Sequence, residues 1–134
     1  MSWSDRYIGI PAKDLGRDWD GVDCWGLVRL CLWEEKHISL PSYVGDYTCT
    51  EERREISRLI NAAEARGPWL PQTVIRSFDV LVFRQGRLRS HVAIAATARH
   101  MLHVHGEDQS KLADIRDPYW SARLVGAFRH EALT

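Results

Sequence analysis

The feature that most constrains the fold is a change in the spacing of apolar residues about half-way along the chain. Up to residue 68 the apolar residues recur with a helical period, and they predict helices over residues 24–36 and 50–65. From residue 73 onwards they alternate with other residues, which is typical of strands whose two faces differ. Helices followed by a run of strands indicate an α+β domain with an antiparallel sheet.

The predicted strands occupy the second half of the chain. They cover residues 78–83, 91–97 and 100–105, and later strands are predicted near 112–115 and 123–129. The Gln85-Gly86 pair predicts a turn after the first of these strands. Residues 1–22 are rich in glycine and aspartate and predict mostly loop.

Two neighbouring strands carry histidines, and the alternation indicates on which face these histidines lie. Along both strands the apolar side chains fall at even-numbered positions, so even positions are expected to face the core. Residues directly opposite each other, such as Ala93 and His103, must then have residue numbers that add to an even number. This requires a loop with an odd number of residues, about three, near 98–100. His91, His103 and His105 then project from one face, beside small alanines that leave room for something to pack or bind.

Cys24 opens the first predicted helix, with Asp23 as its N-cap. The free N–H groups and the dipole of a helix N-terminus favour a thiolate, and they are aimed where an oxyanion would form. A thiolate beside a histidine that is held by a third group is the working arrangement of cysteine acyl transfer. His91 suits the role of the base, and His103, one strand away, suits the role of the third group.

These residues also have plainer interpretations. A helical cysteine is more often a small buried hydrophobe, and a strand histidine is more often a surface or satisfied polar residue. The pair His103 and His105 could equally hold a metal ion with Cys24 or His91, although no carboxylate is obviously near and only one cysteine is well placed.

The composition excludes several classes of protein. The 134 residues fit one domain, and 18 basic with 18 acidic side chains give a net charge of zero. This balance argues against a nucleic-acid wrapper and against a polybasic membrane binder. The charged first residues do not form a secretory signal, and no stretch approaches the ~20 apolar residues of a membrane span. Three cysteines without a CxxC pair fit neither a disulfide framework nor a zinc knuckle, and Cys31 is expected to be a buried free thiol.

Several segments, in the right order, resemble motifs of the NlpC/P60 family of cysteine peptidases, and specifically of its phage-tail branch. They are YIGIP at 7–11, GRD at 16–18, GVDCWGLV at 21–28, KHISLPSY at 36–43, FDVLVFR at 78–84, SHVAI at 90–94 and MLHV at 101–104. The likeness extends to residues 120–130 and so covers nearly the whole chain.

This resemblance implies a single catalytic domain over residues 1–134 with a papain-like α+β fold. In that fold N-terminal helices, one of them starting at the nucleophile, pack on an antiparallel sheet. The resemblance implies Cys24 as nucleophile, His91 as base and His103 as the third member, with no metal or organic cofactor. The implied reaction is hydrolysis of an amide in a peptidoglycan stem peptide, often the bond after D-γ-glutamate.

The phage-tail likeness also implies a setting. We expect a protein made in the cytoplasm, carried to the cell wall by a phage or phage-like tail through a tail-protein partner, and binding neither nucleic acid nor membrane. Two alternatives stay open at this point: a structural tail component with an idle papain-like site, and an acyltransferase on the same fold.

Asp23, Trp25 and Ser90 are the candidates for substrate binding. In relatives that act on free stem peptides, an Asp and a Ser flanking the nucleophile help to hold the peptide amine, and here Trp25 replaces that Ser. Ala12 stands where relatives often carry an aromatic residue, and Tyr7 is a candidate to take its place. Among the six tryptophans, Trp19 and Trp25 are expected in the cleft.

Overall fold

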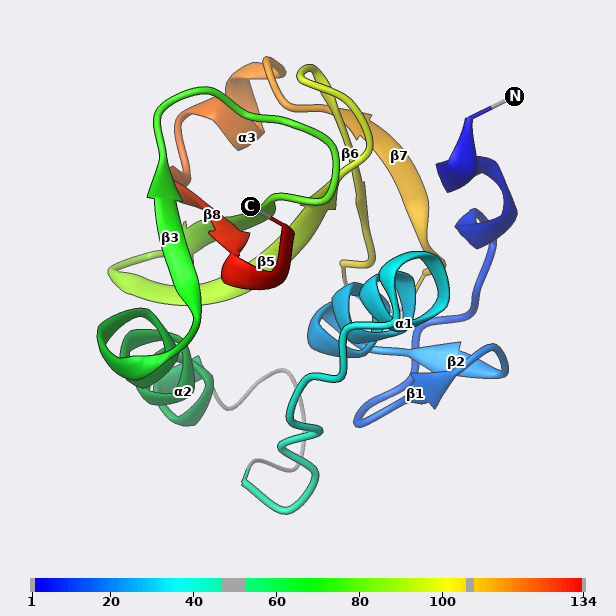
Figure 1. The fold of residues 1–134 in the computed structure, drawn as a ribbon, viewed down its shortest axis with the longest axis horizontal. Helices are drawn as coiled ribbons and strands as arrows, with labels where there is room; N and C mark the ends of the chain where they lie inside the picture. Colours follow the sequence, from blue (N-terminus) through cyan, green and yellow to red (C-terminus); the bar gives the residue numbers. More distant parts are fainter. Residues whose placement is uncertain (1, 47–52, 106–107, 134) are drawn as a thin grey trace.

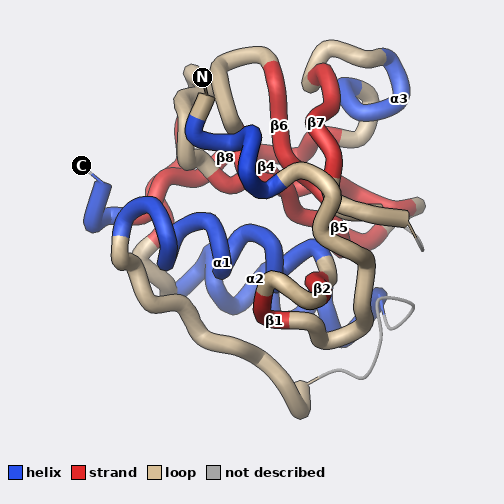
Figure 2. The backbone as a smooth tube through the Cα atoms, turned by 90° about the vertical axis from the view of Figure 1, so that its right-hand side faces the viewer, coloured by secondary structure: helices blue, strands red, loops and turns tan. Residues whose placement is uncertain are grey.

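A computed structural model describes residues 2–46, 53–105 and 108–133. Two long helices lie on one face of a six-stranded sheet, and a short helix lies on the other face (Figures 1 and 2). The strand order is β3-β8-β4-β5-β6-β7, and neighbouring strands are antiparallel. The α+β class and the antiparallel sheet predicted from the alternation are therefore confirmed.

The first long helix, α1, spans Cys24–Lys36, the range that the sequence predicts. It begins where the Asp23 side chain accepts a hydrogen bond from the Gly26 N–H, and it ends at His37, which adopts a left-handed conformation with φ of 55°. The second, α2, spans Arg53–Arg66 and ends before the predicted Gly67-Pro68 break, while its predicted start at residue 50 lies outside the described residues. Three short helical segments complete the set: η1 (Trp3–Tyr7), α3 (Pro118–Ser121) and η2 (Glu131–Leu133). In the described part of the chain, no helix is long and apolar enough to cross a membrane.

Five of the strands correspond to the predicted ones, with ends shifted by a few residues. They are β4 (Val80–Gln85), β5 (Leu88–Ala95), β6 (His100–His103), β7 (Lys111–Asp114) and β8 (Leu124–His130). The sequence missed β1 (Arg17–Asp18), β2 (Gly21–Val22) and β3 (Trp69–Gln72). The first two are only two residues each, and β3 is an edge strand that contains Pro71. Such short or proline-containing segments lack an alternating signal.

The predicted register of the two histidine strands is confirmed. Ile94 pairs with Leu102 and Ala95 pairs with Met101, which gives the expected even index sum. The Ala96 N–H donates to the carbonyl of His100 across a turn of three residues, 97–99. Even positions of β4, β5 and β6 join α1 in one hydrophobic core, as the parity of the pattern predicts.

The space beside the alanines, which the sequence predicted to be open to packing or binding, is filled by other side chains of the chain. The odd face of the sheet has its own hydrophobic core, which consists of Leu81, Phe83, Ala93, Ala95, Met101, Ile115 and Ala127, with Trp120 packed against it. The alanines accommodate these larger neighbours, because a sheet with both faces covered needs some small side chains for close packing. Both faces of the central strands are therefore buried.

The start of α1 is held in place by the β1–β2 hairpin. A Cβ atom on Gly26 would lie 1.9 Å from the carbonyl oxygen of Gly16, so only glycine allows this approach of helix and hairpin. Arg17, in β1, donates to the Gly16 carbonyl and to that of Ser42, and it pairs with Asp23. The first turn of α1 thus has a position that is set by backbone contact.

The substitution Gly26→Ala is expected to destabilise the fold by about 2 kcal/mol or more, because overpacking outweighs the better helix propensity of alanine. Urea unfolding of the purified variant measures this change. Gly86→Ala is the control: Gly86 has a φ of 65° and open space around its Cβ position, so only a backbone penalty of about 1 kcal/mol applies. An equal loss of unfolding free energy in the two variants would contradict the proposed effect of the close contact between Gly26 and Gly16.

Candidate active site

Cys24 is the first residue of α1 and lies against β5. Its side chain is buried, with 7% of the residue exposed. Burial raises the pKa of the thiol to about 12, and the Asp23 carboxylate adds to this effect. The backbone N–H groups of Val92 and Trp25 and the Arg17 guanidinium lower the pKa, but by less. The expected preference for a thiolate is therefore wrong for the free chain, because desolvation outweighs the helix N-terminus.

His91 lies on β5 next to Val92, and His103 lies on β6. The Nε2 atom of His91 is 3.2 Å from the Nδ1 atom of His103, and both residues are buried. Burial lowers the pKa of His91 well below its usual value and that of His103 to about 4, with neighbouring histidines contributing in the same direction. The two imidazoles are therefore neutral at pH 7, and they share one hydrogen bond.

Trp120 of α3 covers the histidines from the far side of the sheet. Its ring stacks on His91 with centroids 5.3 Å apart and planes at 28°. It also meets His103 edge-on at 4.7 Å and His105 at 5.4 Å. Sequence reasoning missed this role, because the contact joins a short helix to strands that lie much earlier in the chain. Trp120 therefore covers one side of the two imidazoles.

Ser90 and His105 are linked through Gln85. The Ser90 hydroxyl donates to Oε1 of Gln85 at 2.7 Å, and Nε2 of Gln85 lies 3.3 Å from Nε2 of His105. The His105 ring is 5.2 Å from the His91 ring, measured between centroids. Ser90 is itself buried. Its hydroxyl is engaged in a side-chain contact within the β4–β5 hairpin.

Asp23 is buried and fully engaged at the start of α1. Its Oδ1 atom accepts from the Gly26 N–H at 2.8 Å and lies 2.7 Å from Nη1 of Arg17. The guanidinium compensates the carboxylate charge in a place where an isolated charge would be costly. Asp23 therefore has a structural role as helix cap and as half of an ion pair.

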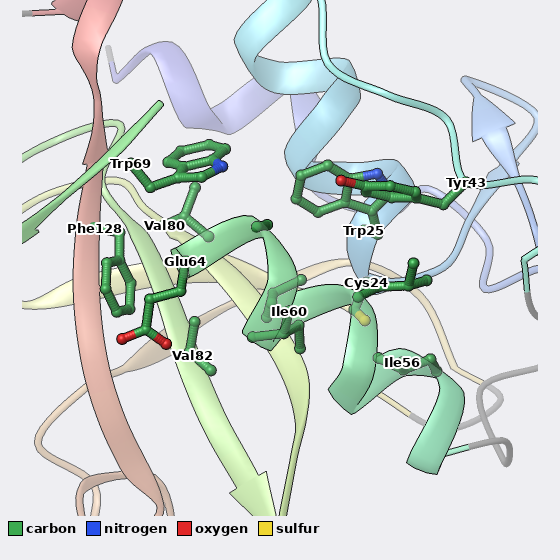
Figure 3. A pocket seen from close by; sticks show the side chains of 13 residues that line it. Cys24, Trp25, Tyr43, Ile56, Ile60, Glu64, Trp69, Val80, Val82 and Phe128 are labelled. Atoms are coloured by element: carbon green, nitrogen blue, oxygen red, sulfur yellow. The ribbon is translucent and has the colours of Figure 1, made fainter. Parts of the chain in front are cut away.

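An open pocket adjoins Cys24 (Figure 3). Its walls are apolar side chains of α2 and of the sheet: Ile56, Leu59, Ile60, Ala63, Val80, Val82, Val92 and Phe128. Trp25 and Tyr43 line it beside Cys24, with ring centroids 5.6 Å apart, and the Trp25 Nε1–H donates to the Pro41 carbonyl. Trp25, which the sequence analysis expected in the cleft, thus lines this pocket.

Trp19 and Tyr7 lie away from this pocket. Trp19 is not among the lining residues, and its ring stacks on that of Tyr7 at 5.0 Å. The Tyr7 hydroxyl donates to Glu35 at 2.6 Å, near the far end of α1. Glu35 follows Cys24 by three helical turns, about 16 Å along the axis. Tyr7 is thus not part of the wall of this pocket, and its hydroxyl is bound at the other end of α1.

No three His, Cys, Asp or Glu side chains within residues 2–46, 53–105 and 108–133 are placed to hold a metal ion. Cys24 and Cys31 are buried free thiols, and the prediction for Cys31 is confirmed. Cys49 lies outside the described residues.

A helix that starts at a cysteine packs on an antiparallel sheet, and the strand against which Cys24 lies also carries one of a pair of buried histidines. This is a papain-like fold. The sequence model of the NlpC/P60 family matches residues 13–129, and the chain belongs to this family. The family and the papain-like α+β fold expected from the sequence motifs are thereby confirmed.

The chain is similar to several characterised proteins. Murein DD-endopeptidase MepS/Murein LD-carboxypeptidase of Escherichia coli K12 is 23% identical over 128 aligned residues, which cover 93% of this chain and 60% of that protein. The crystal structure of the NlpC/p60 domain of peptidoglycan hydrolase SagA has a TM-score of 0.62 at 21% identity, over 92% of this chain and 90% of that one. An NLP/P60-family protein of Staphylococcus aureus has a TM-score of 0.64 at 20% identity, over 93% and 38%. These solved structures support the fold.

The neutral histidine pair predicts a pH-dependent stability. In the unfolded chain a histidine titrates near 6.5, whereas the folded pKa of His103 is about 4, so protonation favours unfolding as the pH falls from 6.5 to 4. This difference between the folded and unfolded pKa corresponds to about 3 kcal/mol of unfolding free energy. His103→Asn is expected to remove that share of the pH dependence, measured by urea unfolding at pH 7, 5.5 and 4.

The control is His100→Asn, at the other end of the same strand, where the histidine is only half-buried. It should keep the pH dependence of the original chain. A His103→Asn variant with an unchanged loss of stability below pH 6.5 would show that His103 is not held neutral.

Proposed function

We propose that this protein is a cysteine peptidase that hydrolyses an amide bond in peptidoglycan stem peptides. The observation that carries the proposal is the placement of Cys24 at the start of α1, against the strand that bears His91, with His103 in contact with His91. The names of MepS and SagA, a murein endopeptidase and a peptidoglycan hydrolase, support the substrate class.

In the proposed mechanism Cys24 is the nucleophile and His91 is the base. His91 Nε2 lies against His103, which leaves His91 Nδ1 to receive the thiol proton. The proton leaves as Sγ bonds to the carbonyl carbon, because a thiol with its pKa raised to about 12 is a weak nucleophile by itself. The N–H groups at the start of α1 stabilise the resulting oxyanion.

His91 then donates its proton to the leaving amine, and the C–N bond breaks to give an acyl-enzyme. Water deprotonated by His91 hydrolyses the thioester and restores the thiol. His103 keeps the His91 ring in one tautomer by accepting the Nε2–H at its own Nδ1. This requires a neutral His103, which its lowered pKa of about 4 ensures at neutral pH.

We further propose a phage or phage-like tail as the setting, with a tail protein as the partner that brings the enzyme to the wall. This rests on the resemblance of the segments around Trp25 and 36–43 to phage-tail relatives. The proposed bond is the one that follows D-γ-glutamate. Trp25, at the edge of the pocket, is the proposed contact for substrate.

Purified protein is expected to release new amines from cell-wall sacculi, and Cys24→Ala is expected to reduce that release at least about a thousandfold, because the nucleophile is lost. Amine release and mass analysis of the muropeptides measure the rate and identify the bond. Cys31→Ala, which removes the other buried thiol of the same helix, should retain most of the activity.

Equal activity in the Cys24→Ala variant would remove Cys24 as the nucleophile. A folded original protein without any hydrolysis would favour a structural tail component with an idle site. Product formation that depends on an added amine or alcohol would instead identify an acyltransferase.

Because Asp23 pairs with Arg17 and caps α1, the enzyme is expected not to require a free amine on the stem peptide. A stem peptide and its N-acetylated form should have kcat/KM values within about threefold of each other. A lost charge-assisted hydrogen bond would lower the value for the acetylated peptide by more than about tenfold. Such a preference for the free amine would show that Asp23 binds substrate.

A further inference from the structure

The segment that follows α1 is held against the helix and the β1–β2 hairpin by hydrogen bonds to three consecutive backbone carbonyls. The bonds run from Arg29 Nε to Leu40 (2.9 Å), from Trp25 Nε1 to Pro41 (2.8 Å) and from Arg17 Nε to Ser42 (3.0 Å). All three donors are side chains, and Trp25 directly follows the proposed nucleophile. The path of residues 40–42 is therefore fixed relative to Cys24.

Tyr43 is the next residue, and its backbone has a left-handed conformation with φ of 57°. This conformation is unfavourable for a residue with a side chain and persists only where the surroundings impose it. Figure 3 shows the Tyr43 ring beside Trp25, with ring centroids 5.6 Å apart, and both rings line the pocket together with Cys24. Residues in such conformations are concentrated at functional sites, so the placement of this ring points to a role in binding.

The hydroxyl of Tyr43 provides a hydrogen-bond donor at this side of the pocket. The N–H of Trp25, the other side-chain donor next to Cys24, is already engaged by the carbonyl of Pro41. No residue in the described part of the chain forms a hydrogen bond with the Tyr43 hydroxyl. Burial raises the pKa of this hydroxyl, and the Asp46 carboxylate adds to the effect, so the phenol keeps its proton at pH 7.

The proposed substrate has an oxygen acceptor close to the reacting group. In a γ-linked glutamyl residue the side-chain carboxyl forms the scissile amide, so the α-carboxyl group remains, separated from the scissile carbonyl only by the short side chain. We infer that Tyr43 binds substrate by donating a hydrogen bond from its hydroxyl to an oxygen of this α-carboxyl group, present as a carboxylate or as a primary amide. The inference rests on the proposed peptidase function and on the proposed bond.

Asp46 favours one of the two forms of this group. Its charge raises the pKa of Tyr43, which means that it disfavours a second negative charge near the phenol oxygen. A bound carboxylate would be disfavoured for the same reason, whereas a primary amide is neutral and offers the same acceptor oxygen. The substrate with the α-carboxamide is therefore expected to bind more tightly than the one with the α-carboxylate.

A matched pair of substitutions tests the contact. Tyr43→Phe keeps the ring and removes only the hydroxyl. Tyr119→Phe makes the same change in α3, where Tyr119 is 47% exposed, and is the control. Each substitution is made in the original chain to measure hydrolysis and in the Cys24→Ala chain to measure binding without turnover.

The probes are three acetyl-alanyl 4-nitroanilides whose second residue is γ-linked D-isoglutamine, γ-linked D-glutamate or 4-aminobutyrate. The last compound has the same chain without the α-carboxyl group. Isothermal titration of the Cys24→Ala chain is expected to give the tightest binding for the isoglutamine compound and the weakest for the aminobutyrate compound. Tyr43→Phe should weaken binding of the isoglutamine compound about tenfold, because a hydrogen bond is lost, and should leave the aminobutyrate compound unchanged. Tyr119→Phe should change none of the three.

Tighter binding of the glutamate compound that is lost in Tyr43→Phe would support the contact and identify the carboxylate as the ligand. No binding of any compound, equal affinity for all three, or an equal loss for all three in Tyr43→Phe would overturn the inference. Release of nitroaniline by the chain that retains Cys24 separates this inference from the peptidase proposal. Binding that depends on Tyr43, without hydrolysis of any compound or of sacculi, would support the contact and overturn the peptidase proposal. Hydrolysis of all three at equal rates, unchanged in Tyr43→Phe, would support the peptidase and overturn the contact.

Discussion

The close packing of the first turn of α1 against β5 and the β1–β2 hairpin is the constraint on which the site depends. Gly26 meets the backbone of Gly16, and Asp23 caps the helix while Arg17 compensates its charge. Each contact fixes the direction in which α1 starts. The place of Cys24 beside the strand that bears His91 is a consequence of this arrangement.

Burial then determines the charge state of the site. The thiol of Cys24 and the imidazoles of His91 and His103 are all desolvated, so all three favour their neutral forms at pH 7. Trp120 contributes by stacking on His91 and meeting the edge of His103.

The two faces of the sheet pack against different parts of the chain. The even face carries α1, α2 and the apolar pocket, and the odd face packs under Trp120 in a second core. His91 and His103 lie at odd positions and thus on the side of that second core. Strand β5 lies between the pocket and the histidines. The backbone N–H of Val92 in this strand is hydrogen-bonded to the Cys24 sulfur.

The sequence by itself determined the element types, the range of α1 and the register of β5 and β6, because hydrophobic period and parity are local properties of the chain. It did not determine the missed strand β3, which contains Pro71 and depends on pairing with β8. Nor did it determine that the Cys24 thiol is protonated or that Asp23 pairs with Arg17. The hydrogen bond from Tyr7 to Glu35 and the stacking of Trp120 on His91 were also not predicted. Only the tertiary structure decided these, because desolvation and contact between residues far apart in the chain exist only once the chain has folded.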